Sequence, residues 1–212
     1  MITIHGRATS SNVQLAMWAV GELGQEHERR DCGGAFGGLD TEAFGAMNPH
    51  RLIPVMVDGD LVVWESAAIL RYLAAQYGDE DFYPHDPRRR AVLDQWAEWG
   101  KNSFAPAVNG GVFWPLIRIK AADRDMAALD QAVARANGLA GLFDRELAGK
   151  AFLGGDALSF ADLAAGHILY RYYTLDFTRA KTPNLDAYYA RLIERPAFQA
   201  HVMISYDSLR VE

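Results

Sequence analysis

The sequence predicts an α/β domain followed by an all-helical domain. Strand and helix patterns alternate over residues 1–78, whereas no convincing strand pattern remains after residue 90. Between them, residues 79–87 carry acidic side chains and two prolines, a composition typical of a linker. We therefore expect domains at 1–78 and 88–212, joined by a linker at 79–87.

The first domain has the expected order βαβ-(α)-ββα. A short strand with Ile2 and Ile4 on one face precedes a helix that ends near Gly24. A weak polar strand, placed near a sheet edge, leads into a Gly-rich segment with room for a short helix. Asp58-Gly59 then joins two strands as a hairpin, and an amphipathic helix closes the unit. In this order the segments span residues 1–6, 11–24, 27–32, 33–50, 55–63 and 66–78.

The second domain is expected to be a helical bundle. Four stretches place apolar residues at helical spacing, and no internal repeat is visible. These stretches cover residues 91–108, 126–147, 159–176 and 184–201.

Length, charge and cysteine content exclude several classes of function. The 212 residues can bury a sizeable core, and the net charge of −6 argues against nucleic acid or an anionic membrane as partner. Cys32 is the single cysteine, so no intrachain disulfide can form, which fits a reducing cytoplasm. We find no run of transmembrane length, no signal-peptide core and no metal-ligand spacing among the six histidines. A cytoplasmic protein without a metal is expected.

The stretch NPHRLIPVMVDGDLVVWESAAILRYL, residues 48–73, carries the strongest functional pattern. Pro54 has no N–H for a sheet ladder, and the Ile53-Pro54 bond stands where a cis peptide would turn the chain. If Ile53 directs its backbone outward, an extended peptide-like ligand can pair with it as an added strand. The alternative is that Pro54 merely begins an edge strand.

Glu65 and Ser66 mark the start of the following helix. Ser66 occupies the expected N-cap, and a helix N-terminus exposes N–H groups that bind carboxylates. Glu65 beside it can pair with an ammonium group. A carboxylate and an ammonium on one carbon describe the end of an α-amino acid, although Ser66 taken alone is more simply an ordinary cap.

These motifs resemble those of the cytosolic glutathione transferases, in particular a bacterial-type member with serine and asparagine in its first turn. The resemblance covers essentially the whole chain and includes LSFADLAAG, residues 158–166, which is similar to the family's helix-capping segment. It implies a thioredoxin-like first domain, a helical second domain and a two-fold homodimer. Glutathione is then the co-substrate, and no further cofactor is expected.

The resemblance also implies roles for residues of the tripeptide site. Ile53 pairs with the cysteinyl part of glutathione, and Pro54 is cis. Glu65 and Ser66 hold the γ-glutamyl end. Arg51, just before Leu52-Ile53-Pro54 in the chain, reaches the glycine carboxylate, unless it is only a surface arginine.

The turn GRATSSNVQ, residues 6–14, is the expected site of thiol activation. A free thiol has a pKa of roughly 8.5, and only the thiolate is a good nucleophile. A helix N-terminus and hydroxyl donors converge in this turn and favour the anion. The family places Tyr, Ser or Cys here, so the resemblance implies Ser10 first and Asn12 second, with Ser11 as a further hydroxyl. The alternative is that these residues only cap the helix.

The second substrate, a small hydrophobic electrophile, is expected between this turn and the helical domain. Phe113, Trp114 and Tyr170 could line an apolar pocket there. Aromatic residues at helical spacing are more often core, which is the competing interpretation. Asn102 and Arg118 are polar candidates near the same region.

Three functions remain open at this point. The favoured one is a glutathione transferase acting in detoxification. A glutathione-dependent peroxidase or isomerase would use the same thiolate, although TSSNVQ departs from the SSCSWR-like turn of the isomerases. A non-catalytic glutathione-binding member would be favoured by loss of the Glu-Ser pair or of the hydroxyl turn, and both are present.

The homodimer has some support in the residues themselves. Val92, Trp96 and Trp99 are spaced to give apolar surface beyond one intradomain stripe. Burial of both tryptophans in the core of their own domain is the competing interpretation.

Overall fold

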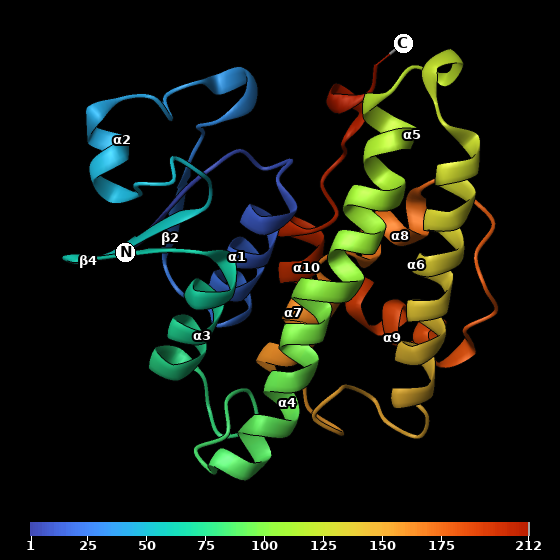
Figure 1. Ribbon diagram of the computed structural model, residues 1–212. Coiled ribbons are helices and arrows are strands. Elements are labelled where there is room, and N and C mark those ends of the chain that lie inside the picture. Colours follow the sequence, from blue (N-terminus) through green and yellow to red (C-terminus); the bar gives the residue numbers. More distant parts are fainter. Residues whose placement is uncertain (212) are drawn as a thin grey trace.

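The protein, described over residues 1–211 by a computed structural model, has a four-stranded sheet with helices beside it and a larger helical domain (Figure 1). The strand order is β2-β1-β3-β4, with β1 parallel to β2 and antiparallel to β3, and β3 antiparallel to β4. The strands are β1 (Ile2–His5), β2 (His27–Arg30), β3 (Val55–Asp58) and β4 (Leu61–Trp64).

The burial of each strand follows from its sequence. Ile2 and Ile4 of β1 and Val55 and Met56 of β3 are buried, so the two central strands supply the core. The polar strand β2 lies at one edge of the sheet, which confirms its expected position. A polar strand suits an edge because its side chains remain partly solvated.

Helices α1 and α3 lie on the side of the sheet that faces the helical domain, whereas α2 lies remote from that domain (Figure 1). Residues 13–20 of α1 are all buried, because α1 contacts α3 on one side and α7 and α10 on another. Gly24, near which the helix is expected to end, follows α1 with φ of +64°, the left-handed geometry typical of a glycine after a helix. The helices are α1 (Ser11–Glu22), η1 (Gly34–Phe36), α2 (Glu42–Met47) and α3 (Ser66–Tyr77).

The start of α3 differs by one residue from the expectation. Glu65 is the N-cap residue, and Ser66 is the first helical residue. Glu65 has φ of +71°, a left-handed conformation that non-glycine residues seldom adopt. The shift leaves the Ser66 hydroxyl free for contacts other than capping its own helix.

The helical domain begins with one almost continuous helical segment from residue 87 to residue 118, which includes two π-helical stretches. Within it, Gly100 packs so closely on α7 that a Cβ there would lie 2.6 Å from Cα of Ala165. The helices of this domain are α4 (Pro87–Trp99), η2 (Gly100–Phe104), η3 (Ala107–Phe113), α5 (Trp114–Arg118), η4 (Ala121–Asp123), α6 (Met126–Glu146), α7 (Phe160–Gly166), α8 (Leu169–Thr174), α9 (Pro183–Ile193), α10 (Pro196–His201) and η5 (Asp207–Leu209).

Two stretches that the sequence predicts as single helices are each divided. Residues 159–176 form α7 and α8, and residues 184–201 contribute to α9 and α10. Pro196 occupies the first position of α10. Proline has no N–H to donate to the preceding turn, so a new helix begins there.

The two tryptophans expected to contribute spare apolar surface pack inside their own domain. Trp99 stacks on Phe104 with ring centroids 5.4 Å apart, and Trp96 meets Trp99 edge-on. Both are half-buried, while Val92 is 56% exposed. The rings thus pack within their own domain while each keeps some exposed surface, and the three-residue apolar surface stays a prediction.

Candidate functional site

Three polar side chains from three separate elements meet where the two domains join. Nζ of Lys101, in η2, lies 2.6 Å from Oδ1 of Asn12, in α1, and 2.9 Å from Oγ of Ser66, in α3. The Ser66 hydroxyl is also 3.3 Å from Oδ1 of Asn12. Asn12 and Ser66, predicted for thiolate and tripeptide binding respectively, are thus brought together, and a cation joins them.

Lys101 is held in an unusual environment for an ammonium group. Burial at the domain boundary lowers the pKa of Lys101 to about 8, although the carboxylates of Glu65 and Glu98 oppose the shift. Desolvation disfavours the charged form, whereas an anion placed close by would restore it. A negatively charged ligand bound beside Lys101 would therefore stabilise the charged form of its ammonium group.

The peptide bond between Ile53 and Pro54 is cis, as expected. The alternative that Pro54 begins an edge strand is wrong, because the strand after it, β3, is paired on both sides. Within residues 1–211, the backbone N–H and C=O of Ile53 have no hydrogen-bond partner. Ile53, Pro54, Glu65, Ser66 and Asn12 line a common small pocket. These backbone groups are available to an extended ligand.

Asn48 shapes the loop that leads to this bond. Its Nδ2 donates to the Leu52 carbonyl at 2.8 Å, and its Oδ1 accepts from the His50 amide at 2.9 Å. Asn48 is only 2% exposed and also lines the small pocket. A buried amide satisfied from both ends fixes the loop conformation.

Glu65 lines the same pocket, and its backbone is in the left-handed region. Such a conformation costs of order 1–3 kcal/mol for a non-glycine residue and tends to persist at ligand-binding positions. Its carboxylate is exposed, so it can receive an ammonium group. The geometry is that of one wall of the pocket.

The turn before α1 presents its hydroxyls without using them for capping. Ser10 is the N-cap residue, yet its side chain makes no capping bond in the described chain. The carbonyls before it are occupied: Ser10 N–H donates to the Arg7 carbonyl at 3.1 Å, and Gln14 Nε2 donates to the Ala8 carbonyl at 3.0 Å. The Ser10 side chain therefore does not cap α1, and the alternative that it only caps the helix is wrong. Ser11, the first residue of α1, lies beside it.

Arg171 of α8 holds the same turn from the helical domain. Its Nη2 donates to the Thr9 carbonyl at 2.7 Å, and its other Nη donates to Asn109 Oδ1. The guanidinium lies 4.0 Å from the centroid of the Phe113 ring. Burial lowers the pKa of Arg171 to about 10, which still leaves the group charged at neutral pH. The positive charge of Arg171 is therefore held next to the turn that precedes α1.

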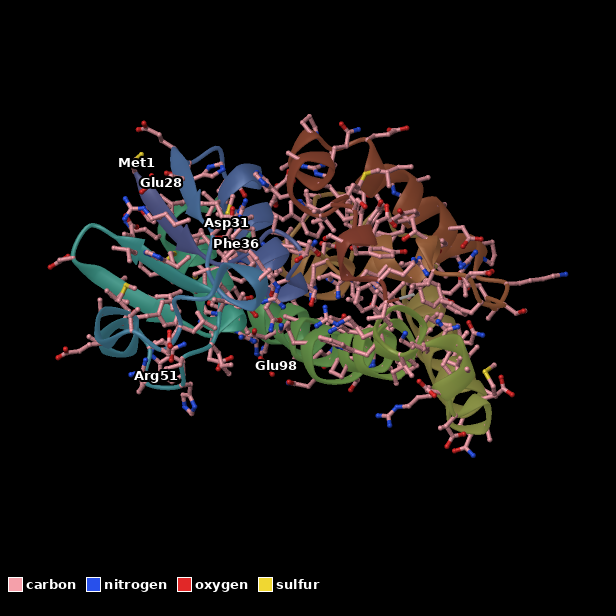
Figure 2. The ribbon with its side chains drawn as sticks, turned by 90° about the horizontal axis from the view of Figure 1, so that it is seen from above. Met1, Glu28, Asp31, Phe36, Arg51 and Glu98 are labelled. Carbon is pink, nitrogen blue, oxygen red and sulfur yellow. The ribbon has the colours of Figure 1, made fainter. Side chains whose placement is uncertain are left out.

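Arg51 lies away from the pocket. Its Nη1 donates to the carbonyls of Leu39 and Thr41 at 2.9 and 2.8 Å, so the side chain braces the loop before α2. Figure 2 shows Arg51 beside α2, apart from the domain boundary. Its assignment to the glycine carboxylate stays a prediction, and it requires these two bonds to be exchanged.

The three aromatic residues predicted for the electrophile pocket are placed differently from one another. Phe113 is 1% exposed and packs against Tyr206, as the core interpretation requires. Trp114 is 39% exposed, and Tyr170 is half-buried beside Tyr206. Trp114 is thus the most accessible of the three.

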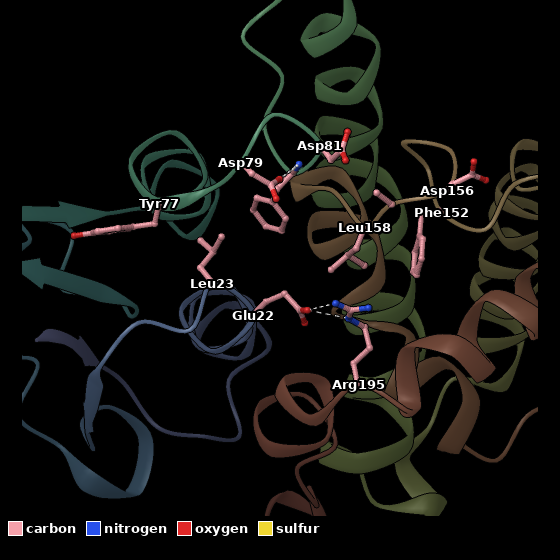
Figure 3. Close-up of a pocket in the computed structure, with 11 residues that line it drawn as sticks. Glu22, Leu23, Tyr77, Asp79, Asp81, Phe152, Asp156, Leu158 and Arg195 are labelled. Atoms are coloured by element: carbon pink, nitrogen blue, oxygen red, sulfur yellow. Dashed lines mark hydrogen bonds and ion pairs between the residues drawn. The ribbon is translucent and has the colours of Figure 1, made fainter.

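Another cavity lies at the opposite end of α1 (Figure 3). It measures about 500 Å³ and is lined mainly by acidic and apolar residues, with Arg195 ion-paired to Glu22 across it. Since α1 has 12 residues and rises about 1.5 Å per residue, this cavity is on the order of 18 Å from the Asn12 cluster. It holds none of the predicted site residues.

Lys101, Asn48 and Arg171 are site residues that the sequence did not reveal. Lys101 and Arg171 belong to ordinary helical patterns, and no local motif marks them. Asn48 has a weak signal, because an Asn-Pro pair favours a turn in which the Asn side chain bonds nearby backbone.

Two further expectations concern absences. Among residues 1–211, no group of three or more His, Cys, Asp or Glu side chains is placed to hold a metal ion. No helix in the described chain is long and apolar enough to span a membrane.

Cys32 is buried against Phe44 and Val55, and burial raises the pKa of its thiol. It is a packing cysteine.

Two family models match the chain. The one described as "Glutathione S-transferase, N-terminal domain" matches residues 4–81, and "Glutathione S-transferase, C-terminal domain" matches residues 106–196. Glutathione S-transferase GstB of Escherichia coli is 37% identical over 206 residues, covering 96% of this chain and 99% of the relative.

Solved structures agree in fold. A theta class glutathione S-transferase from Xanthomonas axonopodis pv. citri, with glutathione bound, is 41% identical, with a TM-score of 0.90 over 96% of this chain and 98% of that one. A glutathione S-transferase from Pseudomonas fluorescens is 28% identical, with a TM-score of 0.79 over 96% and 99% of the two chains.

Proposed function

Because the chain belongs to the glutathione S-transferase family, we propose that it is a glutathione transferase that joins the sulfur of glutathione to a small electrophile. The observation that carries the proposal is the meeting of Asn12, Ser66 and Lys101 next to the unpaired backbone of Ile53. Cation, hydroxyl, amide and free backbone groups together fit a tripeptide with a charged end.

In the proposed complex the γ-glutamyl end of glutathione lies at the start of α3. Its carboxylate accepts from the Ser66 hydroxyl and the first amides of the helix, with Lys101 supplying the charge. Its ammonium pairs with Glu65. The cysteinyl backbone pairs with the N–H and C=O of Ile53, after Pro54 has turned the chain.

The sulfur then lies at the turn before α1. Ser10 donates a hydrogen bond to the thiolate, with Asn12 or Ser11 as the neighbouring polar group. The hydroxyl stabilises the anion and does not remove the proton, because a serine hydroxyl is far too weak a base. Helix α1 and the charge of Arg171 behind Thr9 add positive potential at this position. The thiolate attacks carbon, a C–S bond forms, and the leaving group departs with its electron pair.

A decisive test combines binding and chemistry. The purified protein is expected to be retained on immobilised glutathione and eluted by free glutathione. It is then expected to conjugate a chromogenic aryl halide faster than the uncatalysed reaction. Retention without conjugation, and without hydroperoxide reduction, would instead support a non-catalytic binding role.

We also propose that the protein is a cytoplasmic homodimer, as the family resemblance implies, with the α/β domain of one subunit against the helical domain of the other. The exposed Val92 on α4 is one apolar residue available for such a contact. Sedimentation equilibrium at micromolar concentration is expected to give twice the chain mass of 23.5 kDa. A single-chain mass would contradict the dimer.

A further inference from the structure

A cavity of about 570 Å³ opens beside the turn that precedes α1. It is bounded by that turn, by the η1 loop, by the end of α5 and by the last residues before the C-terminus, with Thr9 and Phe36 among its lining side chains. Figure 2 shows Phe36 on the side of the α/β domain that faces the helical domain. A volume of this size is in the range of roughly 300–1,000 Å³ typical of small-molecule pockets.

The cavity carries more positive than negative charge. Arg7, Arg29 and Arg118 line it, with Asp31 as the one acid among its lining residues. Arg29 is already engaged, because it forms an ion pair with Asp31 and donates to the Gly6 carbonyl. Within residues 1–211, neither Arg7 nor Arg118 has a carboxylate partner. Two cations therefore face the cavity uncompensated by the described residues.

Each of the two arginines is positioned by its surroundings. Arg118 lies over the Trp114 ring, 5.0 Å from its centroid. Arg7 runs along Gly34, where a Cβ would lie 3.2 Å from its Cδ, and Gly34 itself has φ of +61°. A glycine there leaves room for the arginine and adopts a backbone conformation that other residues avoid. Burial and the nearby charge of Arg118 both lower the pKa of Arg7, so the two guanidiniums repel one another. An anion between them would relieve that repulsion.

The cavity adjoins the expected position of the glutathione sulfur. Thr9 lines it and directly precedes Ser10, and the Thr9 carbonyl is held by Arg171. Phe36 and Leu209 supply apolar lining on the same cavity. A ligand with an apolar body and one anionic group would meet complementary surface at both ends.

We propose that the second substrate of this protein is an electrophile that carries a carboxylate, which Arg7 and Arg118 bind. The inference rests on the proposed transferase function and gives the chemical class of its second substrate. The carboxylate pairs with the two guanidiniums, and the apolar part packs on Phe36 and Leu209. The reactive carbon then faces the thiolate. The C–S bond forms, the bond to the leaving halide breaks with both electrons on the halide, and the thiol proton passes to solvent.

The test compares a chlorodinitrobenzoate with the matching chlorodinitrobenzamide, which share the ring, the nitro groups and the leaving chloride. For each, kcat/KM is divided by the rate constant of the uncatalysed reaction with glutathione. The benzoate is expected to show at least about a tenfold greater enhancement than the benzamide, because the two guanidiniums bind its carboxylate as a pair. Arg7→Gln and Arg118→Gln are each expected to bring that ratio close to one, and Arg7→Lys to retain part of it.

Arg88→Gln is the matched control, because it removes one exposed cation at the start of α4, outside the cavity. It is expected to keep the wild-type ratio. Equal enhancement of both compounds by the wild type would overturn the carboxylate proposal and leave the transferase function standing.

If neither compound is conjugated, the transferase function fails, and binding decides the carboxylate site separately. Dinitrobenzoate and dinitrobenzamide, which have no leaving group, are then titrated by quenching of tryptophan fluorescence. Tighter binding of the benzoate that is lost in Arg7→Gln supports the site. Equal binding of the two compounds overturns it.

Discussion

The ammonium of Lys101 lies 2.9 Å from the hydroxyl oxygen of Ser66, although one residue belongs to the helical domain and the other begins the last helix of the α/β domain. Lys101 also reaches Asn12, so it joins α1 and α3 at their N-terminal ends. The polar cluster therefore needs residues of both domains: Asn12 and Ser66 from the α/β domain and Lys101 from the helical domain.

Because of Lys101, the affinity for glutathione is expected to fall at alkaline pH. Its pKa in the free protein is about 8, so it loses its charge as the pH rises through that value, and an anionic ligand then binds more weakly. S-methylglutathione, which has no titrating thiol, is the suitable probe for calorimetry. Its affinity is expected to fall above pH 8 in the wild type. In Lys101→Arg the fall near pH 8 should disappear, because a guanidinium stays charged.

The matched comparison for this charge is Lys101→Gln. It is expected to bind S-methylglutathione at least about tenfold more weakly at neutral pH, since one charge-assisted contact is lost. Lys120→Gln, an exposed lysine outside the cluster, should leave the affinity unchanged. If the affinity of Lys101→Arg for S-methylglutathione still falls near pH 8, the fall is caused by the ligand's own amine and not by Lys101.

Ser66 is expected to matter for binding more than for stability. Ser66→Ala should weaken glutathione binding by about 1–3 kcal/mol, because a hydrogen bond to a carboxylate is lost. Calorimetry measures the affinity, and thermal denaturation checks that the variant is folded. Unchanged affinity in a folded Ser66→Ala protein would remove Ser66 from the proposed site.

Ser10 is expected to act on the thiolate. Ser10→Ala should raise the pKa of the bound glutathione thiol and lower kcat, with a smaller effect on glutathione affinity, because the donor favours the anion over the neutral thiol. Ultraviolet absorbance of the thiolate against pH gives the pKa directly. If Asn12→Ala shifts that pKa and Ser10→Ala does not, the two residues exchange roles.

Asp162 is expected to control the stability of the helical domain. Its buried carboxylate accepts from the amides of Leu153 and Ser159, each at 2.8 Å, from the Ser159 hydroxyl and from the Tyr188 hydroxyl. Asp162→Asn places a donor opposite these donors and should cost about 2–4 kcal/mol in the free energy of unfolding. Urea titration measures the loss. Asp156→Asn in the nearby loop is the control and should unfold like the wild type.

Local patterns in the sequence determined a large part of the fold and some of the candidate site. The hairpin at Asp58-Gly59, the left-handed Gly24 and the capping segment at Ser159 and Asp162 all depend on neighbours within a few residues. Such features are readable because the residue type restricts its own backbone or bonds to the next turn.

The tertiary structure alone decided which charges reach the site. Lys101 is 35 residues from Ser66, and Arg171 is 162 residues from Thr9, yet each pair is in hydrogen-bond contact. Arg51, two residues before Ile53 and the cis bond, instead donates to the carbonyls of Leu39 and Thr41. No local sequence pattern predicts which distant group a long cationic side chain will contact. Lys101 reaches Asn12 and Ser66 only because η2 and α7 pack together, and Gly100 beside it fits there because a Cβ would lie 2.6 Å from Cα of Ala165.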